Sequence, residues 1–257
     1  TPQEYKALKP GDDAMHLLHL DQPILEINIT PDRGYAFSYR GVAREYHHST
    51  GAKFVDPVTE LNKRAPAAPA AESGVSSDIE VIVDDNNPIH GVTGCDRYVA
   101  RAIHGFDPTN HTPNWMRRRL IRAGMRSISL AVDVTNYVML DLGQPMHAYD
   151  LDKIEGPIVV RRAAEGEKLT TLDGKEHDLS VEDLLITDSP DGKRGSRILG
   201  IAGVMGGLYG EVTADTKNIL LEAAHFDSVS IARSARRHKI PSEASRRFER
   251  GVDTQLQ

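Results

Sequence analysis

The sequence contains very little cysteine: Cys95 is the single one among 257 residues, so no disulfide can form within the chain. No stretch approaches the run of about 20 apolar residues that a membrane-spanning helix needs, and the first residues lack the pattern of a secretory signal. We therefore expect a cytoplasmic protein with no membrane contact. Because the chain begins with Thr1 instead of methionine, we also expect a piece of a longer protein.

An overall excess of basic residues is also absent, since the formal net charge is -6. This argues against a surface that holds long nucleic acids by neutralising phosphates. Two basic clusters are nevertheless present, and their members are Arg117, Arg118, Arg119, Arg122 and Arg126, then Arg233, Arg236, Arg237, His238, Lys239, Arg246, Arg247 and Arg250. The ordinary interpretation is two solvated helix faces, with direct nucleic-acid binding as a weaker alternative.

Several motifs of enzyme chemistry are missing. The sequence has neither a P-loop nor a dinucleotide-binding fingerprint, no Gly-x-Ser-x-Gly elbow, and no histidine or cysteine spacing typical of zinc. We therefore expect no metal and no cofactor in this region, and no nucleophile supplied by the protein.

The N-terminal quarter predicts a small separate piece. Residues 24–29 alternate apolar and polar side chains as a half-buried strand does, and a helix capped by Ser38 and ended by Gly51 should follow. The Pro- and Ala-rich stretch 63–77 predicts an extended linker. It would separate residues 1–62 from a main body at residues 78–251.

The main body predicts an α+β fold with mixed, largely antiparallel sheets and a few packed helices. Strand-like runs occur at 98–103, 158–162 and 184–187, and Asp173-Gly174 predicts a two-residue turn in a hairpin. Three helices are expected: one capped by Thr112 and running to Gly124, one capped by Asp133 and running through Leu142, and one capped by Asp227 and reaching about residue 237.

Three segments of this body carry candidate site residues. The first offers Thr135, Asn136 and His147, although a surface asparagine and a structural histidine are the more ordinary interpretations taken alone. The second, residues 201–207, has three glycines in seven residues, which suits either a tight turn or a close approach of backbone to a ligand. The third places Glu222 in an apolar strand, where a carboxylate must pair with an arginine or await a donor from a ligand.

Read in order, these segments resemble the beta chain of bacterial phenylalanyl-tRNA synthetase over nearly the whole length. The residues that carry the resemblance are Ile24–Arg33, Arg40–Glu45, Val132–Leu140, Gly143–His147, Ile201–Gly207 and Glu243–Asp253. The resemblance implies that residues from about 78 to 251 form the paired third and fourth domains (B3/B4), the editing module, and that residues 1–62 belong to a small preceding domain.

The resemblance also implies a function: hydrolysis of tyrosine wrongly attached to the tRNA for phenylalanine, by attack of a water molecule. Carried over by motif, the catalytic residues are Thr135, Asn136 and His147, and the substrate-binding residues are Ala202, Gly203, Gly206 and Glu222. The partners implied are the tRNA, tyrosine and a separate alpha chain in a heterotetramer of two alpha and two beta chains, and the full enzyme would use ATP and magnesium. The alternative is a non-catalytic scaffold, or a module that binds an amino acid or RNA.

Overall fold

The computed structural model describes residues 9–13, 15, 21–64, 75–77, 79–85 and 88–257. Its helices, with 3-10 helices marked η, are η2 (Gly34–Ala36), α2 (Tyr39–Thr50), α3 (Pro57–Arg64), α4 (Asn114–Arg122), α5 (Leu130–Leu142), η3 (Leu151–Lys153), η4 (Pro190–Gly192), α6 (Ser228–His238) and α7 (Glu243–Phe248). Its strands are β1 (Val75–Ser77), β2 (Val81–Asp84), β3 (Cys95–Ile103), β4 (Met146–Asp150), β5 (Ile158–Arg162), β6 (Lys168–Thr170), β7 (Glu176–Asp178), β8 (Leu184–Asp188), β9 (Arg197–Ile201), β10 (Met205–Gly206) and β11 (Ile219–Phe226).

Two sheets dominate the fold. The first has the strand order β1-β3-β11-β4, the second has the order β10-β9-β8-β5-β2, and β6 pairs with β7 in a separate hairpin. Only the β1–β3 and β2–β5 pairs are parallel among the described strands. The predicted α+β class with largely antiparallel sheets is therefore confirmed.

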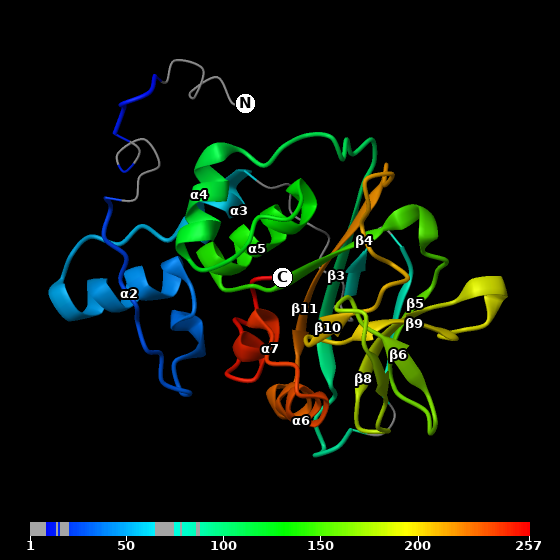
Figure 1. Ribbon diagram of the computed structural model, residues 1–257. Coiled ribbons are helices and arrows are strands. Elements are labelled where there is room, and N and C mark those ends of the chain that lie inside the picture. Colours follow the sequence, from blue (N-terminus) through cyan, green and yellow to red (C-terminus); the bar gives the residue numbers. More distant parts are fainter. Residues whose placement is uncertain (1–8, 14, 16–20, 65–74, 78, 86–87) are drawn as a thin grey trace.

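The hydrophobic core lies between the two sheets. Tyr98, Leu220 and Phe226 of the first sheet share one buried cluster with Ile158 and Leu199 of the second. On its other face the first sheet packs against α5, where Ala131, Ala148 and Ile219 form a smaller cluster. Figure 1 shows α4 and α5 beside the first sheet, with the second sheet on the opposite side and α6 and α7 near one end of the strands.

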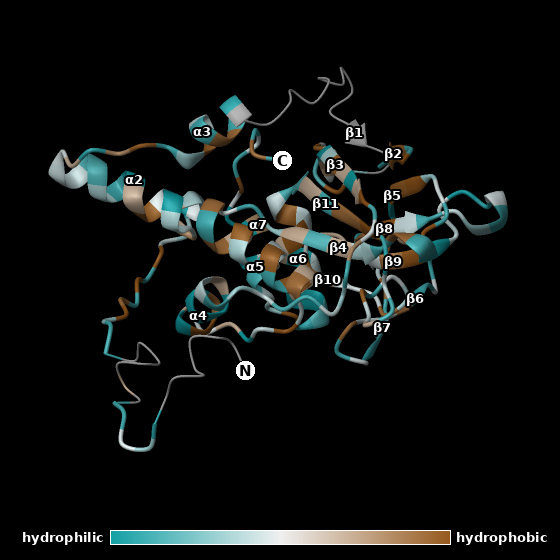
Figure 2. Cartoon of the chain, turned by 90° about the horizontal axis from the view of Figure 1, so that it is seen from above, coloured by the Kyte–Doolittle hydropathy of each residue, from teal (hydrophilic) through white to brown (hydrophobic). Residues whose placement is uncertain are grey.

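Seen from above, the helices gather at one side of the molecule and the sheets at the other (Figure 2). Apolar residues, brown in that view, are concentrated along strands such as β5 and β11. This agrees with the complete burial of Ile158, Val160 and Leu220. No described helix is long and apolar enough to cross a membrane.

The N-terminal helix α2 is held against the C-terminal end of the chain. Ser38 caps this helix by accepting a hydrogen bond from the amide of Gly41, and Gly51 ends it with a φ of 73°, as predicted. Arg40 forms ion pairs with Asp56 at 2.8 Å and with Asp253 at 3.1 Å. Arg247 of the main body also donates to the carbonyl of Phe37 at 3.1 Å, so the described part of the small N-terminal piece contacts the main body directly.

The strand predicted at residues 24–29 is wrong. These residues form no regular structure, and Ile24, Leu25 and Ile27 are 64%, 83% and 50% exposed. A strand needs a neighbour to satisfy its backbone groups and to cover its apolar face. No described strand lies alongside this segment, so the alternating pattern has nothing to pair with.

The turn of the predicted hairpin is one residue longer than expected. Gly174 alone takes a positive φ, of 78°, and its amide donates to the carbonyl of Thr171. The amide of Thr171 donates to the carbonyl of Lys175, which leaves three residues in the loop. The side chain of Asp173 accepts from Thr171 Oγ1 at 2.6 Å, so it closes the loop instead of occupying a left-handed position.

Two predicted helix starts are also displaced. Thr112 does not cap α4; its hydroxyl donates to the carboxylate of Asp133 at 2.5 Å. That carboxylate lies inside the first turn of α5, because the helix begins after Ser129, four residues before the predicted cap. It also accepts from Ser127 and from the amide of Ile128. The third prediction is confirmed, because Asp227 accepts from the amide of Ser230 at the start of α6.

The ends of the predicted linker belong to regular elements. Helix α3 extends to Arg64, and Val75–Ser77 form strand β1. The rest of the predicted linker, residues 65–74, lies outside the described residues, and so does position 78.

Candidate functional site

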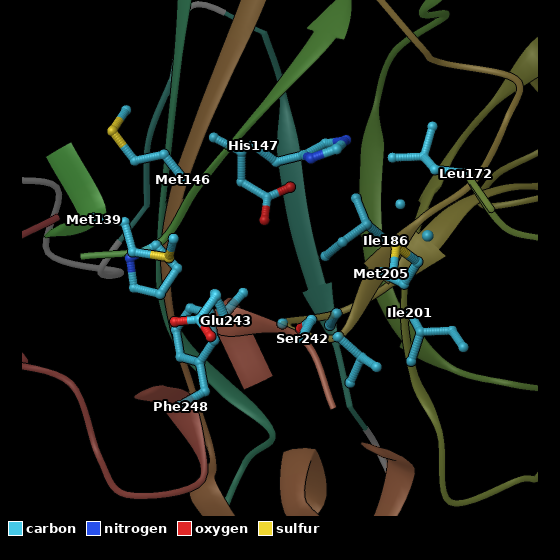
Figure 3. Close-up of a pocket in the computed structure, with 18 of the residues that line it drawn as sticks. Met139, Met146, His147, Leu172, Ile186, Ile201, Met205, Ser242, Glu243 and Phe248 are labelled. Carbon is cyan, nitrogen blue, oxygen red and sulfur yellow. The ribbon is translucent and has the colours of Figure 1, made fainter. Parts of the chain in front are cut away.

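A cavity of about 220 Å³ lies where the two sheets meet the C-terminal helix α7. Its walls come from β4 and β11 of the first sheet, from β8–β10 of the second, and from α5 and α7, as Figure 3 shows for part of the lining. The lining residues are Asn136, Met139, Pro145, Met146, His147, Tyr149, Leu172, Ile186, Gly200, Ile201, Ala202, Gly203, Val204, Met205, Gly206, Glu222, Ser242, Glu243, Ala244 and Phe248. Segments far apart in the chain therefore meet in one pocket.

The sheet register brings Glu222 and His147 together. The two residues are directly paired across the antiparallel strands β11 and β4, and paired residues project from the same face of a sheet. On the opposite side of β11, Glu222 pairs with Ala100 of β3. The small alanine leaves room beside the carboxylate.

The carboxylate of Glu222 is buried and held by two phenols. Tyr98 Oη donates to Glu222 Oε2 at 2.8 Å, and Tyr149 Oη donates to the same oxygen at 2.7 Å. Burial raises the pKa of Glu222, while the two tyrosine hydrogen bonds act in the opposite direction. The sequence left two possibilities for Glu222, an arginine partner or a donor from a ligand. No arginine pairs with it among the described residues, so the first possibility is wrong.

The second oxygen of Glu222 remains available. No described residue donates a hydrogen bond to Oε1, although the side chain lines the cavity. A carboxylate oxygen can accept two hydrogen bonds. The site therefore presents a buried acceptor whose other oxygen already binds phenol hydroxyls.

His147 forms the wall beside this carboxylate. Its ring lies edge-on to Tyr149, with ring centroids 4.5 Å apart and planes at 73°. Burial lowers the pKa of His147 from its ordinary value of 6.5 to about 4. The imidazole is therefore neutral near pH 7, with one nitrogen able to accept a proton or a hydrogen bond.

The glycine segment lets the second sheet approach His147 closely. A Cβ atom at Gly206 would lie 2.8 Å from His147 Cε1 and 2.9 Å from Nε2, nearer than real Cβ contacts. At Gly203 the φ is 65°, and a Cβ would lie 2.9 Å from Phe248. Glycine is thus required at both positions by close packing, and at Gly203 also by backbone conformation.

Six of the seven predicted site residues line this cavity, and Thr135 does not. Asn136, His147, Ala202, Gly203, Gly206 and Glu222 are all part of its wall. Thr135 is buried in α5, and its hydroxyl donates to the carbonyl of Val132 at 2.9 Å. The structure therefore shows Thr135 engaged within its own helix.

Residues from the start of α7 also line the cavity and were not predicted as site residues. They are Ser242, Glu243, Ala244 and Phe248, and Figure 3 shows Ser242 and Glu243 across the pocket from His147. Glu243 forms ion pairs with Arg246 and Arg247. The motif Glu243–Asp253 was noticed in the sequence, but nothing in its composition indicated that its first residues would face a pocket.

Comparisons with known proteins agree with these motifs. The family model described as "B3/4 domain" matches residues 94–257. The chain is 83% identical to a phenylalanine–tRNA ligase beta subunit from Bifidobacterium longum over 99% of this chain and 29% of the relative. It is 55% identical to one from Leifsonia xyli subsp. xyli over 96% of this chain and 27% of the relative. The chain thus spans less than a third of the curated relatives that it matches.

One solved structure that the comparison found is an N-terminal fragment of the phenylalanyl-tRNA synthetase beta subunit from Pyrococcus horikoshii. It shares 18% sequence identity and a TM-score of 0.40, covering 84% of this chain and 64% of that fragment. The family model alone matches more than half of the chain. The resemblance inferred from the motifs is therefore confirmed at the level of the family. This chain belongs to the B3/4 domain family.

Proposed function

We propose that this chain is the editing region of a phenylalanine–tRNA ligase beta subunit and hydrolyses tyrosine from the tRNA for phenylalanine. The similarity to curated beta subunits supports its place in the ligase. The observation that carries the editing activity is the buried Glu222, which lines the cavity and whose Oε2 accepts two tyrosine hydroxyls, while no described residue donates to Oε1.

Selection for tyrosine follows from the chemistry of this acceptor. A pocket shaped for phenylalanine cannot strongly reject tyrosine, whereas a pocket with a buried polar group can require the added hydroxyl. A tyrosine hydroxyl would donate to Glu222 Oε1 as the protein's own phenols donate to Oε2. Phenylalanine would leave that oxygen unsatisfied, at a cost of about 1–3 kcal/mol.

The size of the cavity supports a single amino-acid side chain as its occupant. Its volume of about 220 Å³ falls below the range of about 300–1,000 Å³ typical of drug-sized ligand sites. Apolar walls from residues such as Met139, Ile186 and Phe248 would enclose an aromatic ring. The same wall carries the polar side chains of Glu222, His147 and Asn136, which a phenol oxygen and an ester would contact.

The hydrolytic step needs an oriented water molecule and no covalent intermediate. The water oxygen adds to the ester carbonyl carbon, the bond to the ribose oxygen breaks, and that oxygen leaves with a proton. Neutral His147 would orient the water or the ribose as a hydrogen-bond acceptor, because burial keeps its pKa near 4 and so disfavours the protonated ring. Asn136, on the same cavity wall, would position the ester.

The same proposal assigns the partners of the chain. The beta subunit would assemble with an alpha chain, two of each, and bind the tRNA for phenylalanine. ATP and magnesium, which the resemblance implies for the complete ligase, would serve the attachment of phenylalanine on the alpha chain. Thr135 would act only by holding the first turns of α5, since its hydroxyl is bound within the helix.

The test is hydrolysis of mischarged tRNA by the complete ligase. Tyrosyl-tRNA and phenylalanyl-tRNA, each labelled in the amino acid, are incubated with the enzyme and with a His147→Ala variant. We expect rapid release of tyrosine, slow release of phenylalanine, and loss of tyrosine release in the variant. Release that persists when both His147 and Glu222 are replaced by alanine would indicate a scaffold or binding module instead.

A further inference from the structure

A second, larger cavity adjoins the first. Its volume is about 1110 Å³, and it lies between the segments that lead into α4 and α5 and the loop before β11. His147 and Leu172 line both cavities. The histidine therefore stands between a small pocket and a large one.

The lining of this second cavity is mixed in character. Phe106, Val132 and Val212 provide apolar surface, while polar side chains include Asn110, His111, Thr112, Asn114, Ser127, Ser129 and Thr213. Arg117 and Glu211 are the only formally charged lining residues, apart from the histidines. Such a lining suits a ligand with an apolar ring, several hydroxyl groups and one negative charge better than a polyanion.

Two polar groups in this cavity have no partner among the described residues. The Oγ atom of Ser129 is buried without a hydrogen bond, although Ser129 precedes α5 and would ordinarily cap it. Arg117 is exposed on α4, and its guanidinium has no hydrogen bond or ion pair with another described residue. A buried hydroxyl without a partner is unfavourable, which indicates a ligand or water at this position.

The neighbouring carboxylate does not occupy these groups. Asp133 is fully buried in the first turn of α5 and accepts from Thr112, Ser127 and the amide of Ile128. Its role is to join the two segments that form the cavity wall. Ser129 and Arg117 remain available to something that enters the cavity.

We propose that the second cavity binds the nucleotide on the 5′ side of the esterified adenosine, with Arg117 on its phosphate and Ser129 donating to its phosphate or ribose. This inference rests on the proposed function, because it assumes that the amino acid occupies the small cavity. An ester bond placed at His147 directs its amino acid into one cavity and its ribose toward the other. The chain of nucleotides must then leave through the larger space.

The chemistry of a nucleotide matches this lining. Bases stack on apolar and aromatic side chains such as Phe106, and most contacts to sugar and phosphate come from arginine, serine, threonine and asparagine side chains. The site would thus recognise an amino acid attached to a polynucleotide, and free amino-acid esters would lack the second half of the contacts. It therefore sets the substrate class as well as the amino acid.

Binding can be measured through Trp115, the single tryptophan of the chain, which lies in α4 and is 48% exposed. The whole 257-residue chain is titrated with adenosine, with adenosine 5′-monophosphate and with the dinucleotide cytidylyl-adenosine, while tryptophan fluorescence is followed. We expect the phosphorylated probes to bind about tenfold more tightly than adenosine, as one charge-assisted contact would give. Arg117→Gln and Ser129→Ala should each reduce this advantage.

Arg126→Gln is the matched control, because Arg126 is exposed and lines neither cavity. This substitution removes one positive charge near the cavity and should leave the tighter binding of the phosphorylated probes unchanged. Equal affinity for adenosine and the phosphorylated probes in the unmodified chain would overturn the inference. So would an equal loss in Arg117→Gln and Arg126→Gln, since only general attraction of anions would then be present.

Hydrolysis in the complete ligase separates this inference from the proposed function. The substrates are 3′-tyrosyl adenosine and tyrosyl-tRNA. We expect Arg117→Gln to slow cleavage of tyrosyl-tRNA about tenfold and to leave cleavage of the adenosine ester unchanged. The unmodified enzyme should cleave both substrates. If Arg117→Gln then slows neither cleavage, or slows both equally, the second cavity is not a nucleotide subsite. If the unmodified enzyme cleaves neither substrate, the proposed function itself fails.

Discussion

At the scale of single residues, the site depends on Glu222 and the two phenols that satisfy it. Tyr98 is fully buried, and its hydroxyl donates to the carboxylate. The Tyr98→Phe variant leaves a buried carboxylate with one donor fewer, so we expect it to lower the free energy of unfolding by about 1–3 kcal/mol. Urea denaturation measures this directly.

Tyr209→Phe is the matched control for that experiment. Tyr209 is 44% exposed, and its hydroxyl accepts from Arg197 at the surface. Loss of this hydrogen bond should lower the free energy of unfolding by less than about 1 kcal/mol. Equal costs for the two variants would mean that the contact between Tyr98 and Glu222 does not stabilise the fold.

The charge state of His147 gives a second prediction at this scale. Burial lowers its pKa to about 4, so the ring should stay neutral from pH 8 down to about pH 5. The signal of its Cε1 proton, assigned by its absence in His147→Gln, should not titrate in that range by NMR. A midpoint near the ordinary value of about 6.5 would contradict the description of the site.

The same shift has a consequence for stability. Below pH 6.5 the unfolded chain binds a proton at this histidine, whereas the folded chain does not until about pH 4. The contribution of His147 therefore destabilises the fold as the pH falls from about 6.5 to about 4. Replacement by glutamine should remove this part of the pH dependence.

At the scale of elements, the short strand β10 packs closely against the ring of His147, a residue of β4. A methyl group at Gly206 would meet the ring of His147 at less than 3 Å, so Gly206→Ala should displace that ring and impair ester hydrolysis. We also expect a cost in the free energy of unfolding of about 1–3 kcal/mol from overpacking. Thermal and urea denaturation together with hydrolysis assays provide the measurement.

A double-mutant cycle identifies the cause of this effect. Without the ring, in the His147→Ala background, the added methyl group at position 206 has more room. The stability cost of Gly206→Ala should then be clearly smaller. Identical costs in both backgrounds would show that the conflict lies elsewhere, for example with Leu172, whose Cδ1 would be 3.2 Å away.

Elements with local signals were predictable from the sequence. The helix after Ser38 has its cap and its C-terminal glycine in the sequence, and β5 at Ile158–Arg162 begins with three apolar, β-branched residues. The start of α5 was misplaced because Asp133, a good capping residue, binds three groups from inside the first turn. The segment 24–29 has the pattern of a strand but lacks a described partner.

The candidate site could be predicted in part. The motifs identified the residues, while the register that pairs Glu222 with His147 and the two phenols on Glu222 come from contacts distant in sequence. No local pattern indicates which tyrosines will donate to a buried carboxylate. For the same reason the contribution of α7 to the cavity was not foreseen.

At the scale of the whole molecule, α2 is held to the main body by Arg40. The guanidinium binds Asp56 and Asp253, and its hydrogen bonds lower the pKa of Asp56 from 3.8 to about 2. Arg40→Met should therefore speed hydrogen exchange of the amides in α2 and leave those of β11 unchanged. Exchange followed by mass spectrometry reports both.

The pH dependence of this contact has a definite sign. The stabilisation from Asp56 is present above pH of about 4 and is lost as the pH falls toward 2, because protonation removes its charge. Exchange in α2 should rise over that interval in the unmodified chain and change little in Arg40→Met. The same pH dependence in both proteins would show that a group other than Asp56 controls the stability of α2.

The central claim is that a phenol hydroxyl is recognised by the buried carboxylate of Glu222. The most direct measurement is the ratio of hydrolysis rates for tyrosyl-tRNA and phenylalanyl-tRNA in the complete ligase, for the unmodified protein and for Glu222→Ala, with the exposed Glu176→Gln as control. We predict that the ratio falls by about 10- to 100-fold in Glu222→Ala, as expected for loss of one buried hydrogen bond, and that the control is unchanged. An unaltered ratio in a folded Glu222→Ala variant would contradict the account.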